Sequence, residues 1–527
     1  MIRLSYRLLI VSVGMLALAP PVLADLLKRV LPDGDGASSA NSHPAGASQL
    51  PDSLFTWAGT ATQVTLADLL QFAIRQSPAL QSAKIDLTIA EAQVEQTWAR
   101  RDWTARVQAS GAKSGATLFS GIQVSGQSMA SVAADLFRVL PTGGTVGIRI
   151  GTQYSDINST FFSSKAWSDT ISGSITQPLL RGGGRNVYDS TERKLELSRD
   201  ASVLAQRLTA LQTVQTVVST YWDLVLAERQ VAITEASLAL ARERLRVTQI
   251  AVKGGKVATA EVPAVELAIA TRQEDVLNGE LAVLDRSIAL RRSVGMPIAD
   301  QELVLRVATD VEIRNRDVDL HSLLDKAYAA SPELAELAKQ DQAATIDIEV
   351  TENGLLPQLD VALSLGPTGF DPTFTGAAKN VAKLNTYQIN GSLTFSRSLH
   401  AYDIRGRSDE LRAGRQKLRV NSLDLRAQIA QAMARAVAQR ELANRRVVLS
   451  QTAIELANEN VRIETDRFNL GRSTNFDVLN RLEEQRQAEL RKAQAQVDWH
   501  KAETVILALT GDLLPTFGIT IESKSTR

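Results

Sequence analysis

The sequence contains no cysteine, and this absence excludes several kinds of chemistry at once. A chain without cysteine has no disulfide, no thiol nucleophile, no thiolate-bound metal and no lipid attached behind a lipoprotein signal. The four histidines, His43, His321, His400 and His500, are far apart and lack the spacing of a metal site. No paired carboxylates and no nucleophile–base arrangement stand out either. The sequence therefore predicts no catalytic residue, no metal ligand and no cofactor.

An excess of either charge is also missing, because 58 basic residues balance 58 acidic ones over 527 residues. A nucleic-acid partner or a polybasic membrane anchor requires a basic excess, so the balance argues against both. The run LLRGGGRN at 179–186 lacks the Lys-Ser or Lys-Thr pair of a phosphate-binding loop. A strand-to-helix turn is the better interpretation of that run.

Long apolar runs are absent beyond the N-terminus. The opening MIRLSYRLLIVSVGMLALAPPVLA has a basic start, an apolar segment and a small-residue end, which is typical of a signal peptide. A single membrane anchor is the alternative, but a spanning helix needs about 20 apolar residues and this segment is shorter. No later run approaches that length, so membrane insertion would have to use strands. We expect a signal peptide over 1–24 and a flexible, low-complexity extension over 25–61.

Proline is missing from two long stretches, between Pro178 and Pro263 and between Pro372 and Pro515. Proline costs about 3 kcal/mol inside a helix, so these gaps permit long uninterrupted helices. Over 208–225 the apolar residues recur at spacings of three and four, the pattern of a coiled coil. Such helices would be longer than any compact core requires, which predicts long paired rods.

The chain repeats itself. LADLLQFAIRQSPAL at 66–80 resembles LHSLLDKAYAASPEL at 320–334, and Gly255 has a counterpart in Gly471. Matching residues are 254 positions apart in the sequence for the two opening segments and 216 positions apart for the two glycines. The first copy is therefore longer, and its extra residues lie between about 111 and 173. A tandem duplication with one insertion accounts for this pattern.

Between the helical blocks the period changes to two. Five segments alternate apolar residues with small or polar ones, as strands do: 104–111, 144–154, 169–177, 357–366 and 387–396. So few strands cannot close a bacterial membrane barrel, which needs at least about eight. Closure by several copies of the chain around an axis would remove the exposed strand edges.

These observations predict a mainly α fold in which long coiled-coil hairpins accompany a few membrane-capable strands. The first repeat is expected at 62–297, with helices at 65–101 and 186–293 and strands within 104–178. A linker at 298–317 leads to a second repeat at 318–513, with helices at 318–353 and 402–511 and strands within 357–397, and a tail follows at 514–527.

The SP-containing amphipathic openings, the AEAQVEQ segment at 90–96 and above all RFNLGRSTNFDVLNRLEEQRQAELRKAQAQVDWHKAETVILALTG at 467–511 resemble TolC-like outer membrane efflux proteins. The resemblance extends from about residue 62 to 513. It implies a homotrimer in which about four principal strands per protomer form a barrel in the outer membrane of a Gram-negative bacterium. The helices would continue as a hollow α-barrel across the periplasm. The insertion at 111–173 departs from the simplest family pattern.

Each repeat has a helix turn, at 252–262 in the first and at 468–478 in the second. The duplication aligns Glu261 with Asp477 in these turns. The residues themselves favour a capping role. Gly255 and Gly471 are typical of helix ends, and Ser473 and Thr474 are good N-caps. An acid in the first turn of a helix also complements the helix dipole.

The family resemblance implies a second role for the same turns, at the periplasmic end where the coiled coils close the channel. It assigns Asp477 and Glu261 to acids that face the pore, and Phe468 to an aromatic gate position. Ser473 stands where a gate arginine can occur, and Asn480 replaces a second acid. A ring of carboxylates would favour cations. The exposed turn residues expected to contact an adaptor are Gly255, Lys256, Gly471, Arg472 and Thr474.

The function implied by the resemblance is that of an exit duct in a tripartite efflux or type I secretion system, not an enzyme. Its expected partners are a periplasmic adaptor (a membrane fusion protein), an inner membrane pump and outer membrane lipid. A periplasmic coiled-coil adaptor or structural protein without a pore is the alternative. Membrane-type strands in both halves argue against that alternative. Trp98, Trp103 and Trp167 flank the strands, where interface anchoring and ordinary packing both remain open.

Overall fold

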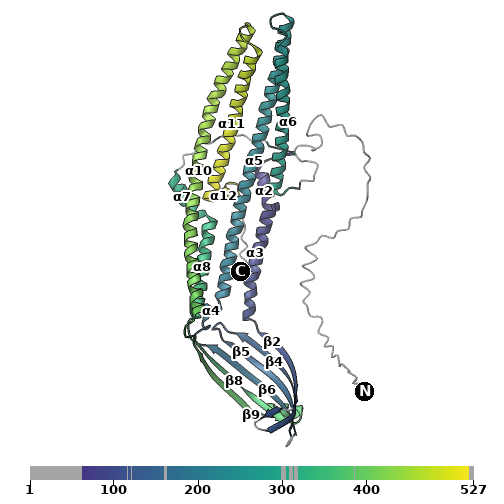
Figure 1. The fold of residues 1–527 in the computed structure, drawn as a ribbon, viewed down its shortest axis with the longest axis vertical. Helices are drawn as coiled ribbons and strands as arrows, with labels where there is room; N and C mark the ends of the chain where they lie inside the picture. Colours follow the sequence, from purple (N-terminus) through teal and green to yellow (C-terminus); the bar gives the residue numbers. More distant parts are fainter. Residues whose placement is uncertain are drawn as a thin grey trace, which may run out of the picture. The chain divides into compact units, whose positions relative to one another are not determined.

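The computed structural model describes residues 62–520, apart from 116, 120–121, 160–162, 298–303, 308–312, 314–318 and 385. The expected signal peptide and N-terminal extension, together with most of the linker, lie outside the described residues. In the part that is described, two groups of helices are joined through a single antiparallel sheet (Figure 1).

Each half opens with a pair of helices that meet at a Ser-Pro step. Helices α2 (Leu66–Gln76) and α3 (Pro78–Trp98) open the first half, and α7 (Leu320–Ala330) and α8 (Pro332–Asn353) open the second. Proline lacks an N–H group and disfavours a helical conformation in the residue before it, so the chain breaks at both steps. Continuous helices over 65–101 and 318–353 would thus be wrong, although both ranges are helical on either side of the break.

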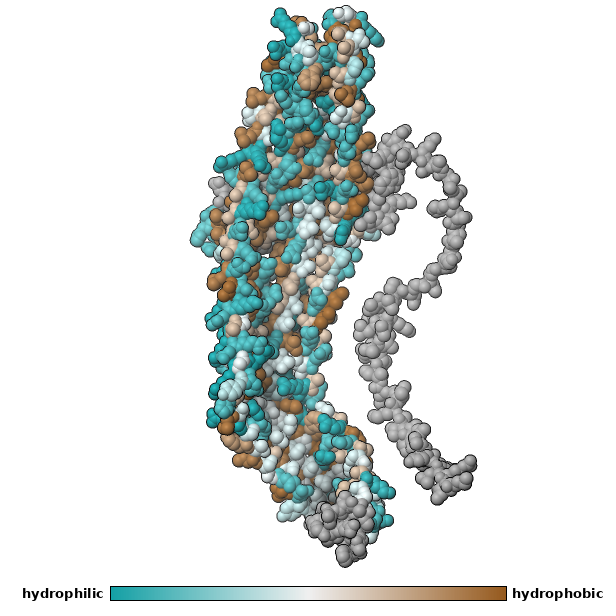
Figure 2. Space-filling model, in the orientation of Figure 1, coloured by the Kyte–Doolittle hydropathy of each residue, from teal (hydrophilic) through white to brown (hydrophobic). Residues whose placement is uncertain are grey.

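Two long helical hairpins follow the strands. Helix α5 (Ser190–Lys253) returns through α6 (Glu261–Val294), and α10 (Tyr402–Asn469) returns through α11 (Asn475–Thr510). At 1.5 Å per residue, the 64 residues of α5 and the 68 of α10 span about 96 and 102 Å. The long helices expected from the proline-free stretches are confirmed. Figure 2 shows that hydrophilic side chains cover much of the helical part on the face drawn.

The main hydrophobic core lies where α2 packs on α5 and α6. Leu69, Leu70 and Ala73 of α2 are buried against Tyr221 and Leu224 of α5. The short α12 (Leu513–Thr516) closes the same core, and β1 (Thr62–Val64) pairs in parallel with β7 (Leu305–Val307) beside it. A smaller core joins α7 to α10 and α11 around Met433. The first residues of the expected C-terminal tail therefore belong to the core.

The described strands other than β1 and β7 form one antiparallel sheet in the order β2-β4-β5-β6-β8-β9, with the short β3 paired to the start of β4. The strands are β2 (Thr104–Ser114), β3 (Thr117–Phe119), β4 (Ile122–Val139), β5 (Thr145–Ser159), β6 (Ser163–Pro178), β8 (Gln358–Asp371) and β9 (Thr386–Ser396). About four principal strands were expected, and that number is too low. The insertion at 111–173 supplies the hairpin of β4 and β5, which widens the sheet in the first half.

The connection between β8 and β9 contains a helix that the sequence analysis did not predict, α9 (Phe374–Ala382). It packs on β8 and β6, at the strand ends away from the long helices. Gly369 permits this contact, because a side chain there would bring its Cβ within 2.1 Å of the Ala377 carbonyl oxygen. The small helix therefore lies directly on the sheet.

Candidate functional site

The sheet has one apolar and one polar face, because side chains of a strand alternate between faces. The register aligns Val107 with Ala134, Ala134 with Ile150 and Ile150 with Ile171, so these four neighbours share a face. We call it the apolar face. Its large residues are exposed although apolar, at 74% for Val107 and 55% for Ile150. Other exposed members are Val132, Leu136, Ile148, Ile175, Val361, Leu363, Leu365, Ile389, Leu393 and Phe395.

The opposite, polar face carries side chains that water can solvate. Arg149 lies 3.6 Å from the carboxylate of Asp135, its neighbour on β4. Ser110 and Ser131 are hydrogen-bonded across β2 and β4 at 2.8 Å. The remaining strands place mainly serine, threonine, asparagine and glutamine on this face: Gln153, Ser174, Thr176, Ser364, Asn390, Ser392 and Thr394. The sheet can therefore separate an apolar phase from an aqueous one.

Strands β2 and β9 form the two edges of the sheet, and neither has a second strand partner among the described residues. Every residue of these two strands is exposed. An open edge of this length presents a row of unpaired backbone N–H and C=O groups, which proteins normally cover or pair. The sheet is thus incomplete as a single copy.

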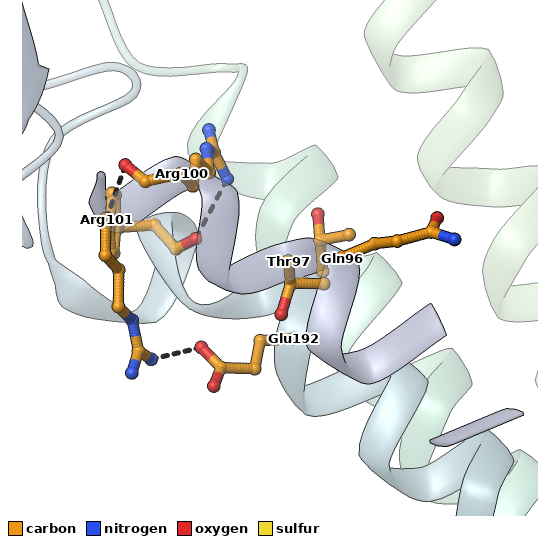
Figure 3. Close-up of a pocket in the computed structure, with 7 residues that line it drawn as sticks. Gln96, Thr97, Arg100, Arg101 and Glu192 are labelled. Atoms are coloured by element: carbon orange, nitrogen blue, oxygen red, sulfur yellow. Dashed lines mark hydrogen bonds and ion pairs between the residues drawn. The ribbon is translucent and has the colours of Figure 1, made fainter. Parts of the chain in front are cut away.

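At the junction of helices and sheet, a hollow of about 340 Å³ lies between the end of α3 and the start of α5 (Figure 3). Arg101 forms an ion pair there with Glu192, and Arg100 donates a 3.0 Å hydrogen bond to the Tyr188 carbonyl oxygen. The Arg100 guanidinium also lies 5.2 Å from the centre of the Tyr188 ring. These contacts fasten the first helix pair to the long helix where the strands begin.

The far ends of the two long hairpins turn in the same way. Gly255 and Gly471 have φ of +66° and +70°, a left-handed conformation that strongly favours glycine. Lys256 N–H donates to the Ala251 carbonyl at 3.0 Å, and Arg472 N–H donates to the Arg467 carbonyl at 2.9 Å. The N–H groups of the two glycines donate to carbonyl groups three residues earlier in the chain. Together these contacts form a Schellman motif at each helix end. The expectation that both glycines end helices is confirmed.

This geometry yields a stability prediction. Nothing lies within 4 Å of a Cβ added at Gly471, so Gly471→Ala meets only the backbone cost of a left-handed alanine, about 1 kcal/mol. Gly414 lies inside α10, where an added Cβ also meets nothing within 4 Å, but its φ is not positive. Gly414→Ala is therefore expected to stabilise the protein by about 1 kcal/mol. Thermal unfolding of both variants checks the opposite signs, and a destabilised Gly414→Ala would contradict the argument.

Asp477 caps its own helix. The Asp477 N–H donates to Thr474 Oγ1 at 3.3 Å, while Thr474 N–H donates to Asp477 Oδ2 at 3.1 Å, a complete capping box. The Thr474 hydroxyl donates a third bond to the same carboxylate oxygen, at 2.7 Å. The hydrogen bonds that Thr474 donates hold the pKa of Asp477 below its ordinary value. The capping role expected from the residues is confirmed, and the carboxylate is charged at neutral pH.

Glu261 does not have the same environment as its aligned partner. Its carboxylate accepts a 3.0 Å hydrogen bond from the N–H of Asn475, at the start of α11 in the other hairpin. Asn475 is fully buried, and its side-chain oxygen accepts hydrogen bonds from Arg244 at 2.8 Å and from Thr248 at 3.1 Å. Glu261 therefore helps to connect the two hairpins instead of repeating the cap of Asp477.

Arg244 completes this connection. Its guanidinium lies 3.8 Å from the centre of the Phe468 ring, at the end of α10. Arg244 is 7% exposed, and burial lowers its pKa from the ordinary value, although the charge of Glu261 opposes this. We call Arg244, Thr248, Glu261, Phe468 and Asn475 the tip cluster. Its members come from α5, α6, α10 and α11.

The other expected site residues lie around the tip cluster. Ser473 donates a hydrogen bond to Glu464, and Asn480 is exposed. Both line a polar groove of about 560 Å³ together with Asp477, Arg467, Arg481 and Glu483. The residues expected to contact an adaptor are all exposed at the turns: Gly255, Lys256, Gly471, Arg472 and Thr474. Phe468, expected at an aromatic gate position, is 5% exposed within one protomer.

Comparison with known proteins assigns these features to a family. Residues 69–296 match the model of the outer membrane efflux protein family. Residues 69–296 therefore belong to the outer membrane efflux protein family. The resemblance drawn from the sequence motifs is thereby confirmed. No curated protein sequence matches this efflux protein.

Solved structures share the fold of the efflux protein at low identity. The Campylobacter jejuni CmeC outer membrane channel is 14% identical, with a TM-score of 0.64 over 90% of this chain and 94% of that one. The Vibrio cholerae outer membrane protein VceC is 14% identical, with a TM-score of 0.64 over 85% and 96%. A Pseudomonas aeruginosa membrane protein, also 14% identical, has a TM-score of 0.65 over 90% and 97%.

Within the described part of the chain, no group of histidine, aspartate and glutamate side chains is arranged to hold a metal ion. None of the helices described above combines the length and the apolar character needed to cross a membrane.

Sequence reasoning missed the two central residues of the tip cluster, Arg244 and Asn475. The residues next to each of them in the sequence do not identify its partner, and the two positions are 231 residues apart although their side chains are hydrogen-bonded. A polar residue that falls on the buried stripe of a coiled coil is the one signal that could have identified them. Arg272 gives the same signal, since it is 6% exposed and donates to Ser237 at 2.8 Å.

Proposed function

We propose that three copies of this efflux protein form a channel through the outer membrane of a Gram-negative bacterium. The sheets would combine into the membrane barrel, and the long helical hairpins would form an α-barrel across the periplasm. One observation carries this proposal above all others. The sheet has an exposed apolar face, a polar face and two open edges, so it needs both a lipid phase and further strands.

The number of strands agrees with closure by several copies. Six principal strands are fewer than the eight of the smallest bacterial barrels. Pairing of β2 in one copy with β9 in the next would place 18 principal strands in a trimer, since three copies contribute six each. Barrels of about 16 to 18 strands enclose an aqueous channel. The polar face would then line the channel, and the apolar face would contact lipid.

The channel would act as the exit duct of a tripartite efflux or type I secretion system. A periplasmic adaptor would engage the exposed turns around Gly255 and Gly471, and an inner membrane pump would supply the energy. The halves at 62–297 and 318–513 would be the two repeats of each protomer, joined by the linker at 298–317. No catalytic role is proposed.

A periplasmic coiled-coil adaptor or structural protein without a pore is the second candidate. The long hairpins would suit that role as well. It would, however, leave the apolar face in contact with water, where monomeric proteins rarely expose large contiguous apolar patches. The exposed apolar residues on all six principal strands therefore favour the duct.

We place the gate at the helix tips. Asp477 and Glu261 would contribute the carboxylates near the pore, with Ser473 and Asn480 beside them. Phe468 would stabilise the closed gate from inside the protomer, because its ring contacts the guanidinium of Arg244. The tip cluster would keep the two hairpins together, and the gate would open when they separate.

The duct and its acidic gate are tested together by conductance. Purified protein in planar bilayers is expected to form cation-preferring channels that multivalent cations block from the tip side. Asp477→Asn keeps a hydrogen-bond acceptor for the cap but removes the charge, so it is expected to weaken this block about tenfold. Because the pKa of Asp477 is lowered, block by the unaltered protein should persist below the ordinary carboxyl pKa and disappear only at more acidic pH.

A matched control separates this effect from a general loss of negative charge. Glu484→Gln removes an exposed acid from the same groove and helix, seven residues further along α11. It should leave the block nearly unchanged. Absence of any conductance would contradict the duct, whereas unchanged block in Asp477→Asn would reduce Asp477 to a helix cap.

A further inference from the structure

The apolar face carries a shallow hollow near the strand ends that point away from the helices. Its volume is about 400 Å³, and it is formed by β2, β4, β5 and β6 of one chain. Ala109, Gly111 and Ala130 give it a floor without large side chains, and the rings of Tyr154 and Trp167 lie at its side. Elsewhere this face carries many valine, leucine and isoleucine side chains, interrupted by small residues such as Gly173 and Gly391.

The strand register explains why these residues meet. Gly111 pairs with Ala130, Ala130 with Tyr154 and Tyr154 with Trp167, which places all four in one row across the sheet. The rings of Tyr154 and Trp167 lie 5.1 Å apart. Phe374 of α9 packs edge-on against Trp167, with ring centres 5.5 Å apart. The aromatic side of the hollow is therefore held in place by contacts within the protomer.

The next row, further from the helices, is charged. Lys113 pairs with Ser128, Ser128 with Asp156 and Asp156 with Lys165. Both lysines are exposed, and Lys165 lies 3.7 Å from the carboxylate of Asp156. Three strand spacings of about 4.8 Å separate the backbones of the two lysines by about 14 Å. The carboxylate of Asp156 lies between the two lysines, so a headgroup with two separated phosphates can place one beside each ammonium group and keep both away from this carboxylate.

The order of side chains along β5 matches a membrane boundary. Ile150 is apolar, Thr152 donates a hydrogen bond to the buried Asp169 of β6, Tyr154 is aromatic, and Asp156 is charged, all on the same face. Aromatic rings favour the zone between hydrocarbon and headgroups, and charges favour the headgroups themselves. The hollow consequently lies at the depth where acyl chains begin, with the lysines at headgroup depth.

We propose that this hollow binds an acyl chain of a bisphosphorylated glycolipid in the outer leaflet, and that Lys113 and Lys165 each contact one of its two phosphates. The inference rests on the proposed function, because it requires the apolar face to contact lipid. The two lysines favour an anionic headgroup, and the hollow without large side chains leaves space for an acyl chain. The site is complete within one protomer. Helix α9 contributes to it, because Phe374 packs against Trp167 and keeps this ring at the side of the hollow.

The test uses the purified full-length protein and lipid A as the bisphosphorylated probe, with bound lipid counted by native mass spectrometry. Lipid A is expected to bind about tenfold more tightly than its monophosphorylated form or phosphatidylglycerol. Ala130→Trp fills the hollow and should weaken binding about tenfold. Ala134→Trp is the matched control, because Ala134 lies on the same strand and face but outside the hollow. Lys113→Gln and Lys165→Gln should each remove the preference for two phosphates.

Two outcomes would overturn the inference: equal affinity for phosphatidylglycerol and lipid A, or equal lipid A binding by Ala130→Trp and Ala134→Trp. Conductance of the same preparations distinguishes this failure from failure of the proposed function. If all variants insert and conduct but lipid A binding is unselective, only the lipid site is wrong. If the unaltered protein forms no channel, the duct itself is wrong.

Discussion

Replacing Arg244 with alanine is expected to increase the conductance of the channel several-fold. Arg244 is buried, donates to the side chain of Asn475 and lies over the ring of Phe468, so its loss removes contacts to two helices at once. The buried amide of Asn475 would lose its charged partner, and together these changes should cost the closed tip about 3 kcal/mol. In the proposed channel, that energy is what keeps the hairpins together.

Arg246→Ala is the control for this experiment. Arg246 lies on the same helix, but it is exposed and pairs only with Glu243, at 2.6 Å. Single-channel recordings should show an altered Arg244→Ala channel beside an unaltered Arg246→Ala channel. Equal conductance in both variants would remove the tip cluster from the gate. A second check is Glu261→Gln, which retains an acceptor for Asn475 N–H and should disturb the tip less than Glu261→Ala.

Placing a charge on the apolar face is expected to prevent membrane insertion. Ile150 is 55% exposed and lies in the middle of the apolar rows of β5, so Ile150→Arg would place a guanidinium in hydrocarbon. A charge at the middle of a membrane barrel costs about 2–4 kcal/mol per copy, and the proposed trimer would bear this cost three times. Inserted protein should fall sharply in membrane fractionation and in liposome reconstitution.

Gln153→Arg is the matched control, because Gln153 lies on the same strand but on the polar face. The proposal assigns this face to the aqueous channel, so Gln153→Arg should insert normally and alter ion selectivity only. Equal insertion of both variants would show that the two faces do not differ in their surroundings. Failure of Gln153→Arg alone would reverse the assignment of the faces.

The parts of the fold that local sequence determines were predictable. The proline-free stretches predicted the long helices, and Thr474 with Asp477 predicted the helix start that the structure confirms as a capping box. Gly255 and Gly471 predicted the turns, because only glycine adopts a left-handed conformation at little cost. Each of these features depends on residues within about four positions of one another.

The parts that depend on distant contacts were not predictable. Arg244 and Asn475 meet only after both hairpins have formed, and nothing near either residue identifies its partner. Phe468 was assigned to a gate by its position in the family pattern, yet its burial depends on Arg244 of another helix. The insertion was recognised and the strand at 144–154 in it was predicted, but the sequence did not identify β4, with which β5 forms a hairpin.

The most direct test of the proposed duct uses the absence of cysteine, since engineered pairs are then the only thiols. One cysteine on edge strand β2, at Gln108, would be combined in turn with one on β9, at Gln388, Asn390, Ser392 or Thr394, all on the polar face. Oxidation in intact membranes should yield a covalent species of three chains for the pair in register. Cross-links that stop at two chains, or none for any pair, would contradict a trimer closed through these edges.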